Sequence, residues 1–212
     1  YATALLRGSK LSAAERSALA LKVAHYTGLS PESVERSDLR VEIFRFCKEL
    51  LRDQGRTVGR LDTRYTGVDR DSAGEKFEFD PAMAEIRGAY SAAINGYVRG
   101  ELKFDQDVPY EVSRPLYMDW GWKEFANRYA AIGESLRKAM AVNPRMRVLV
   151  ASGYYDLATP HFAADYSFDH LGIPQELRAN LEMTYYEAGH MMYAHKPSLE
   201  KLADHLRRFV TA

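Results

Sequence analysis

The sequence predicts an α/β fold in which strands alternate with helices over the C-terminal third of the chain. Two short apolar runs predict strands, one from Arg147 to Ala151 and one around Leu181 to Tyr186. A helical pattern from about Pro160 to His170 separates them, and another from Ser198 to Phe209 follows. This alternation indicates a parallel sheet. Because two strands alone do not make a stable sheet, we expect further strands from another segment.

The first 145 residues are predicted to be mainly helical. The expected helices are Ser12 to Tyr26, a short one from Ser30, Asp38 to about Gln54, Pro81 to about Val98, and about Lys123 to Met140. The first begins with a capping box, in which the hydroxyl of Ser12 is followed three residues later by Glu15. The charged stretch from Arg56 to Asp80 reads as loop, within which RLDTRYTG is either a short strand or extended.

The composition is that of a chain with a packed core and no excess of either charge. Hydrophobic residues make up 46%, and Lys plus Arg and Asp plus Glu both number 29. Nucleic-acid binding normally requires clustered basic residues, so no nucleic-acid partner is expected. No apolar run approaches the roughly 18 residues that a membrane helix needs, so no membrane span is expected. The single cysteine, Cys47, lies in an apolar pattern that favours a buried core residue over a reactive thiol.

One polar residue follows each predicted strand: Asp156 follows the first and His190 the second. In open α/β sheets, catalytic groups lie beyond the carboxyl ends of the strands. An acid followed by a histidine is the order of the last two members of a Ser-Asp-His triad in α/β-hydrolases. From spacing alone, a capping aspartate and a structural histidine remain alternatives. Tyrosines beside both loops, such as Tyr154 and Tyr185, are interpreted mainly as strand packing, with pocket lining as the alternative.

The residues around these positions resemble the serine carboxypeptidases, in particular the bacterial branch of that family. The resemblance lies in GYYDLATP, which contains Asp156, and in AGHMMYAHKP, which contains His190. The stretches YTGLSPESVERSDLR and FCKELLRDQGRTVGRLD extend it over the helical part. It implies that this chain is the C-terminal part of an α/β-hydrolase fold with a mainly helical cap insertion. Residues 1–145 would be the cap, and residues 146–212 the last strands and helices of the core.

The resemblance also implies roles for individual residues. Asp156 would orient His190, and His190 would be the general base toward a serine. Thr159 and Met191 match positions that line the pocket for the leaving residue. The family often continues GHMVP where this chain has GHMMY, which leaves the pocket lining open. No cofactor and no metal ion is expected, and the histidine spacing does not match a zinc motif.

The nucleophile of the family lies in a G-E-S-Y-G-G elbow, which this sequence does not contain. Ser135 lies in a G-E-S triplet, but leucine and arginine follow where an elbow needs a second small residue. Its surroundings, NRYAAIGESLRKAM, also predict a helix throughout. No catalytic serine is therefore assigned. We expect the N-terminal part of the same hydrolase to supply it, either as a second chain or as a segment outside this one.

These observations favour a serine carboxypeptidase that releases C-terminal residues from peptides through an acyl-enzyme. One alternative is another α/β-hydrolase, an aminopeptidase or an esterase, because G-x-x-D followed by G-H is shared by those enzymes. The other is an inactive fragment or binding scaffold, because the nucleophile is not assigned. The resemblance implies a periplasmic or secreted enzyme. The start at Tyr1, without a methionine or a signal-peptide pattern, is expected to be internal.

Overall fold

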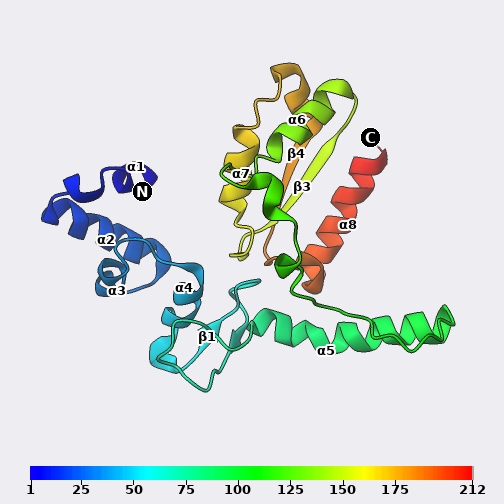
Figure 1. Ribbon diagram of the computed structural model, residues 1–212, viewed down its shortest axis with the longest axis horizontal. Helices are drawn as coiled ribbons and strands as arrows, with labels where there is room; N and C mark the ends of the chain where they lie inside the picture. The colour runs from blue at the N-terminus through cyan, green and yellow to red at the C-terminus, as the bar shows by residue number, and fades with distance from the viewer. Residues whose placement is uncertain (212) are drawn as a thin grey trace. The chain divides into compact units, whose positions relative to one another are not determined.

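The computed structural model describes residues 1–211, which form a mixed α/β arrangement dominated by helices (Figure 1). The chain divides into two compact units, Tyr1–Met83 and the residues from Ala84 onward. The expected division between a cap (residues 1–145) and a core (residues 146–212) is a division by role, and it stays a prediction.

The first unit consists of short helices and one small strand pair. Its elements are α1 (Ala2–Leu5), η1 (Gly8–Lys10), α2 (Ala13–Thr27), α3 (Pro31–Arg36), α4 (Ile43–Glu49), η2 (Arg52–Gln54), β1 (Thr57–Val58) and β2 (Thr66–Gly67). β1 and β2 pair antiparallel, so part of RLDTRYTG is a short strand. The buried core of the unit consists of Ala20, Ala24, Leu29, Val34 and Leu39.

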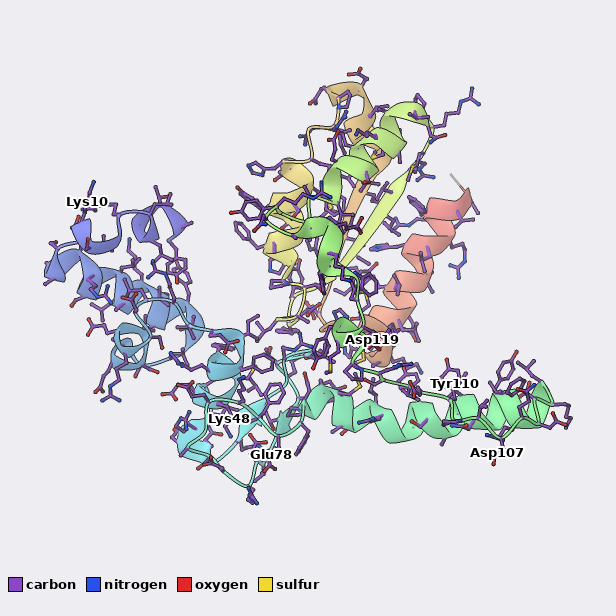
Figure 2. All side chains as sticks on the ribbon, in the orientation of Figure 1. Lys10, Lys48, Glu78, Asp107, Tyr110 and Asp119 are labelled. Carbon is purple, nitrogen blue, oxygen red and sulfur yellow. The ribbon has the colours of Figure 1, made fainter. Side chains whose placement is uncertain are left out.

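The second unit contains the parallel strands. Its elements, with the first turn of α5 preceding the unit boundary, are α5 (Pro81–Asn95), the π-helix η3 (Gly96–Glu101), η4 (Leu116–Met118), η5 (Trp122–Phe125), α6 (Gly133–Val142), β3 (Val148–Gly153), α7 (His161–Asp169), η6 (Gln175–Asn180), β4 (Leu181–Tyr186), η7 (Met192–Ala194) and α8 (Lys196–Thr211). β3 and β4 pair in parallel, as expected, and Figure 1 shows them between α7 and α8. Arg99 donates to the carbonyl of Val108 at 3.2 Å, so the loop with Asp107 and Tyr110 turns back toward the end of η3 (Figure 2).

The expected signals at the ends of α2 are confirmed. The hydroxyl of Ser12 accepts from the backbone N–H of Glu15 at 3.3 Å, and the Glu15 carboxylate accepts from the Ser12 N–H at 2.9 Å. Gly28 ends the helix in the left-handed region, with φ of 75°. These groups satisfy backbone donors and acceptors that helix ends otherwise leave without partners.

The expected helix from Asp38 to Gln54 is wrong at its start. Asp38 and Leu39 have φ of 51° and 61°, which no helix accommodates. The irregular turn places Leu39 in the core at 1% exposure, and this burial outweighs the local helical pattern. The helix α4 begins later, where the carboxylate of Glu42 accepts from the N–H groups of Phe44 and Arg45.

The expected helix from Lys123 to Met140 is also wrong over its first half. The 3-10 helix η5 ends at Phe125, and α6 begins only at Gly133. Asn127 between them has φ of 60°, a left-handed conformation that interrupts a helix. The apolar periodicity of the segment did not reveal this break.

Cys47 is fully buried, which confirms its expected place in a core. Burial, together with a smaller effect of the negative charge of Asp80, raises the pKa of its thiol to about 12. The thiol therefore stays protonated at neutral pH, whereas reactive cysteines have a lowered pKa.

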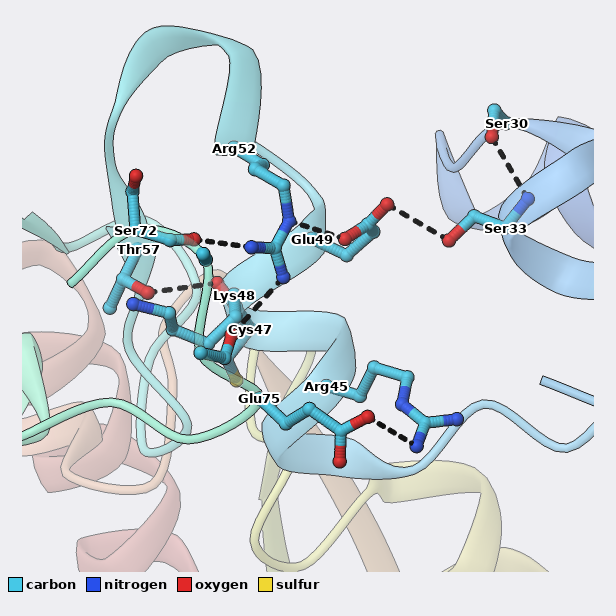
Figure 3. A network of polar contacts seen from close by, with 12 residues as sticks. Ser30, Ser33, Arg45, Cys47, Lys48, Glu49, Arg52, Thr57, Ser72 and Glu75 are labelled. Carbon is cyan, nitrogen blue, oxygen red and sulfur yellow. Dashed lines mark hydrogen bonds and ion pairs between the residues drawn. The ribbon is translucent and has the colours of Figure 1, made fainter. Parts of the chain in front are cut away.

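Basic residues of α4 and η2 hold the acidic loop that follows β2 (Figure 3). The ammonium of Lys48 lies 2.6 Å from a carboxylate oxygen of Asp69, and both side chains are 2% exposed. The ammonium also donates to the carbonyl of Asp71 at 2.6 Å. The N–H of Glu78 donates to the other oxygen of Asp69 at 3.3 Å, so Lys48 and Glu78 flank one buried carboxylate (Figure 2). The loop is thus organised around a fully enclosed ion pair.

Replacing Lys48 with methionine is expected to lower the free energy of unfolding by about 3–5 kcal/mol, because it leaves the buried carboxylate of Asp69 without its counter-charge. Arg45→Met is the matched control on the same helix. Its ion pair with Glu75 is solvent-exposed, so a loss of about 0–1 kcal/mol is expected. Urea unfolding of both variants measures the difference, and equal losses would contradict this account of the loop.

Candidate active site

The two loops that follow β3 and β4 meet at the carboxyl ends of the two strands. Gly153 and Tyr186, the last residues of the strands, lie opposite each other. Asp156 comes three residues after β3 and His190 four residues after β4. The structure brings them together: Nδ1 of His190 lies 2.9 Å from Oδ2 of Asp156. The pattern of strands followed by polar loops therefore located both side chains.

Gly153 allows this approach because it carries no side chain. A Cβ atom there would lie 2.3 Å from the carbonyl oxygen of Gly189 and 2.4 Å from that of Ala188, closer than real Cβ atoms come. Both obstacles are backbone atoms and cannot rotate away. The N–H of Tyr154 donates to the carbonyl of Tyr186 at 3.0 Å, which continues the strand pairing past Gly153. The glycine thus sets the spacing of the two loops.

Replacing Gly153 with alanine is expected to lower the free energy of unfolding by about 1–3 kcal/mol, since the added methyl forces the backbones apart. Gly88→Ala provides the control, because Gly88 lies on α5 with no atom near its missing Cβ. There alanine is expected to be neutral or to stabilise by up to about 1 kcal/mol. Chemical denaturation of both variants tests this, and a neutral Gly153→Ala would show that the contact is not tight.

The carboxylate of Asp156 is 3% exposed and accepts hydrogen bonds at both oxygens. Oδ1 accepts from the N–H groups of Ala158 and Thr159, at 2.7 and 3.0 Å. Oδ2 accepts from the hydroxyl of Thr159 at 2.6 Å and from His190. Four donors around one carboxyl group favour its ionised form, because a carboxylate is an acceptor only. Asp156 is therefore suited to stabilise a positive charge on the imidazole of His190 and not to donate a proton.

The electrostatics of Asp156 agree with this arrangement. Burial by itself raises the pKa of the carboxyl group, but the hydrogen bonds from His190 and Thr159 outweigh it. The pKa falls from the ordinary 3.8 to about 2. A buried group with a lowered pKa stabilises the folded state wherever it is ionised.

The pH dependence of stability follows from this shift. The contribution of Asp156 is complete above about pH 4 and is lost as the pH falls toward 2, with a size on the order of 2 kcal/mol. The difference in unfolding free energy between the wild type and Asp156→Asn is therefore expected to shrink over that interval. Denaturant titrations from pH 5 to pH 2 measure it. A difference that stays constant would contradict the lowered pKa.

The hydrogen bond to Asp156 determines what the imidazole of His190 offers. With the proton of the neutral ring on Nδ1, facing Asp156, the lone pair lies on Nε2, which is the form that acts as a general base. The His190 side chain is 43% exposed, in contrast to the enclosed carboxylate. The pair thus presents an oriented base at an accessible position.

Thr159 and Met191, the expected pocket residues, lie in different settings. The hydroxyl of Thr159 is 3.2 Å from Nδ1 of His190 and donates to Asp156, so Thr159 contacts both members of the Asp156–His190 pair. Met191 directly follows His190 and is half-buried at the start of η7. Pocket lining by these residues stays a prediction. The contact of Thr159 with the pair was not evident from the sequence, although its position three residues after an aspartate is typical of a side chain that closes a turn.

Two residues of α7, the helix that follows the Asp156 loop, were not found from the sequence as site residues. Asp165 of α7 accepts a hydrogen bond from the hydroxyl of Tyr185, and His161 lies at the start of the same helix. Their spacing of four residues places them on one face of α7, which was the only available signal. Ser135 is exposed in the first turn of α6, in a helix and not at a strand-to-helix elbow.

Among residues 1–211, no group of three or more His, Cys, Asp or Glu side chains is arranged to hold a metal ion. No helix over the same range has the length and hydrophobicity that crossing a bilayer requires. No family model, curated protein or solved structure matches the chain.

Proposed function

We propose that this chain supplies the aspartate and the histidine of the catalytic triad of a serine carboxypeptidase, a hydrolase that releases C-terminal residues from peptides. The observation that carries the proposal is the Asp156–His190 pair, in which a buried carboxylate orients an exposed imidazole beyond the ends of two parallel strands. The motifs around the pair favour a carboxypeptidase within the α/β-hydrolases, and they favour a periplasmic or secreted enzyme.

The chemistry that this pair supports is acyl transfer to a serine supplied by a segment outside this chain. Nε2 of His190 takes the proton of the serine hydroxyl while the serine oxygen attacks the peptide carbonyl. The resulting imidazolium is stabilised by the carboxylate of Asp156, and it passes the proton to the leaving amine. A water molecule, deprotonated by the same nitrogen, then releases the acyl group and regenerates the serine.

One edge of the strand pair supports the expectation that further strands complete this fold. The N–H of Tyr154 faces β4, since it donates to Tyr186. Because these directions alternate along a strand, the backbone groups of Leu149 and Ala151 face away from β4. β3 contains no charged residue, which is typical of an inner strand of a parallel sheet. Within residues 1–211 it pairs with β4 alone.

The opposite edge, along β4, is protected. The ammonium of Lys201 donates to the outward carbonyl of Tyr185 at 2.9 Å, and Glu182 places an exposed charge in the strand. Charges and lysine contacts of this kind are how proteins block an edge against further pairing. We therefore place the remaining strands of the hydrolase, with the nucleophile, on the β3 side.

The activity is tested with the native hydrolase that contains this chain and three substrates of matched side chains: a blocked dipeptide with a free carboxylate, a blocked amino-acid ester and an aminoacyl amide. A carboxypeptidase hydrolyses the blocked dipeptide and stops doing so when its carboxylate is amidated. Preference for the aminoacyl amide would indicate an aminopeptidase, and activity on the ester alone an esterase. Hydrolysis of none of the three would leave the scaffold alternative.

A further inference from the structure

A cluster of four side chains joins β4 to α7 and to the start of the loop that carries Asp156: Tyr154, His161, Asp165 and Tyr185. Tyr185 is the second-last residue of β4, and its hydroxyl donates to Oδ1 of Asp165 at 2.6 Å. The other oxygen of Asp165 lies 3.7 Å from Nδ1 of His161, one helical turn earlier. Asp165 therefore faces one residue from β4 and one from its own helix.

The aromatic rings of the cluster hold the start of the loop that carries Asp156. The ring of Tyr154 stacks on that of Tyr185, with centroids 5.8 Å apart and planes 11° apart. His161 meets both rings edge-on, at 5.3 Å from Tyr154 and 6.1 Å from Tyr185. Edge-to-face and offset-stacked arrangements of this kind stabilise ring pairs beyond their burial.

The position of these contacts relative to the catalytic loop is what makes them informative. The loop between β3 and α7 starts at Tyr154 and ends at Pro160, directly before His161, and it contains Asp156 and Thr159. Tyr185 touches both ends, the first by stacking and the second through His161 and Asp165. The strand of Tyr185 continues into the loop of His190, five residues later. One side chain thus connects the two loops that must stay in register for Asp156 to reach His190.

We propose that Tyr185, acting through its hydrogen bond to Asp165, is a positioning residue for the Asp156–His190 pair. It touches no reacting atom, and it acts by fixing the loop from Tyr154 to Pro160 against β4. Its role in turnover rests on the proposed function, whereas its role in the geometry of the pair does not.

The tyrosine is well suited to a constant donor role. The hydrogen bond to Asp165 raises the pKa of Tyr185 to about 12, with burial and the nearby negative charges adding to the effect. The phenol therefore stays protonated over the range in which a histidine base operates. By contrast, the ring of Tyr154 contacts the cluster by stacking on Tyr185 and by its edge-on contact with His161, and Tyr154 is about half exposed.

The test compares Tyr185→Phe with Tyr154→Phe, since both keep their rings and only the first removes the hydrogen bond to Asp165. In the native protein that contains this chain, the proton NMR signal of the His190 Nδ1–H, bonded to Asp156, reports the pair directly. We expect Tyr185→Phe to shift this signal upfield and broaden it as the bond to Asp156 lengthens, and Tyr154→Phe to leave it unchanged. Asp165→Asn keeps an acceptor for Tyr185 and is expected to leave the signal close to that of the wild type, whereas Asp165→Ala is expected to behave like Tyr185→Phe.

In the native hydrolase, Tyr185→Phe is expected to lower kcat about tenfold with KM unchanged, since misplacement of a catalytic group by about 1 Å costs up to 10²-fold. An unchanged Nδ1–H signal in folded Tyr185→Phe and Asp165→Ala would overturn the inference. If Tyr185→Phe does not fold, the comparison of Asp165→Asn with Asp165→Ala decides. A signal that depends on Tyr185 in a protein without hydrolase activity would refute the proposed function and support the positioning role.

Discussion

Replacing His190 with alanine is expected to lower kcat of the proposed hydrolase on the order of 10⁶-fold, the loss that follows removal of the base of a serine triad. Without the imidazole, no group takes the proton of the serine, so the acyl-enzyme does not form at a useful rate. The side chain is 43% exposed, so the fold does not depend on its burial. Steady-state kinetics measures the loss, and circular dichroism confirms that the variant is folded.

His170→Ala is the control for a general effect of removing a histidine. His170 ends α7 on the surface, and its Nδ1 lies 2.7 Å from the carbonyl of Tyr166 in its own helix. Its removal is expected to leave kcat within about twofold, since surface changes away from the site have small effects. Near-wild-type activity of His190→Ala would refute the triad assignment.

Replacing Asp156 with asparagine is expected to lower kcat on the order of 10⁴-fold, less than the loss of the base itself. The carbonyl oxygen of asparagine still accepts from the N–H groups of Ala158 and Thr159, so the loop is expected to keep its shape. Its amide group, however, donates toward Nδ1 of His190 and selects the tautomer with the proton on Nε2. That tautomer has no lone pair facing the serine.

Asp169→Asn makes the same chemical change at an exposed position near the end of α7, where the side chain is 75% exposed. Its kcat is expected to match the wild type. Equal activities of Asp156→Asn and Asp169→Asn would mean that Asp156 caps a turn and plays no part in catalysis.

The sequence was sufficient for features that depend on local pattern. Apolar runs with a polar residue at the end identified β3 and β4, and their alternation with helices predicted the parallel pairing. The proximity of Asp156 and His190 follows from that pairing, because the carboxyl ends of neighbouring parallel strands lie at the same end of the sheet. The capping box at Ser12 is equally local, since its partners are three residues apart.

Features that depend on distant contacts were not accessible in this way. α4 starts later than expected because Leu39 is buried in a core that includes Ala20 and Val34. The contact of Tyr185 with Asp165 joins residues 20 positions apart on different elements, and no periodic pattern in the sequence predicts it. The enclosure of Lys48 with Asp69 is similar, because a lysine in a helical pattern normally faces solvent.

The most direct test of the central claim is labelling of the native protein with a fluorophosphonate, followed by mass spectrometry of the labelled peptide. If Asp156 and His190 serve a serine outside this chain, the label is expected on a serine in a G-x-S-x-G elbow, and His190→Ala is expected to abolish labelling while His170→Ala retains it. Labelling that persists at the wild-type rate in His190→Ala, or no labelled serine in the active native protein, would contradict the claim.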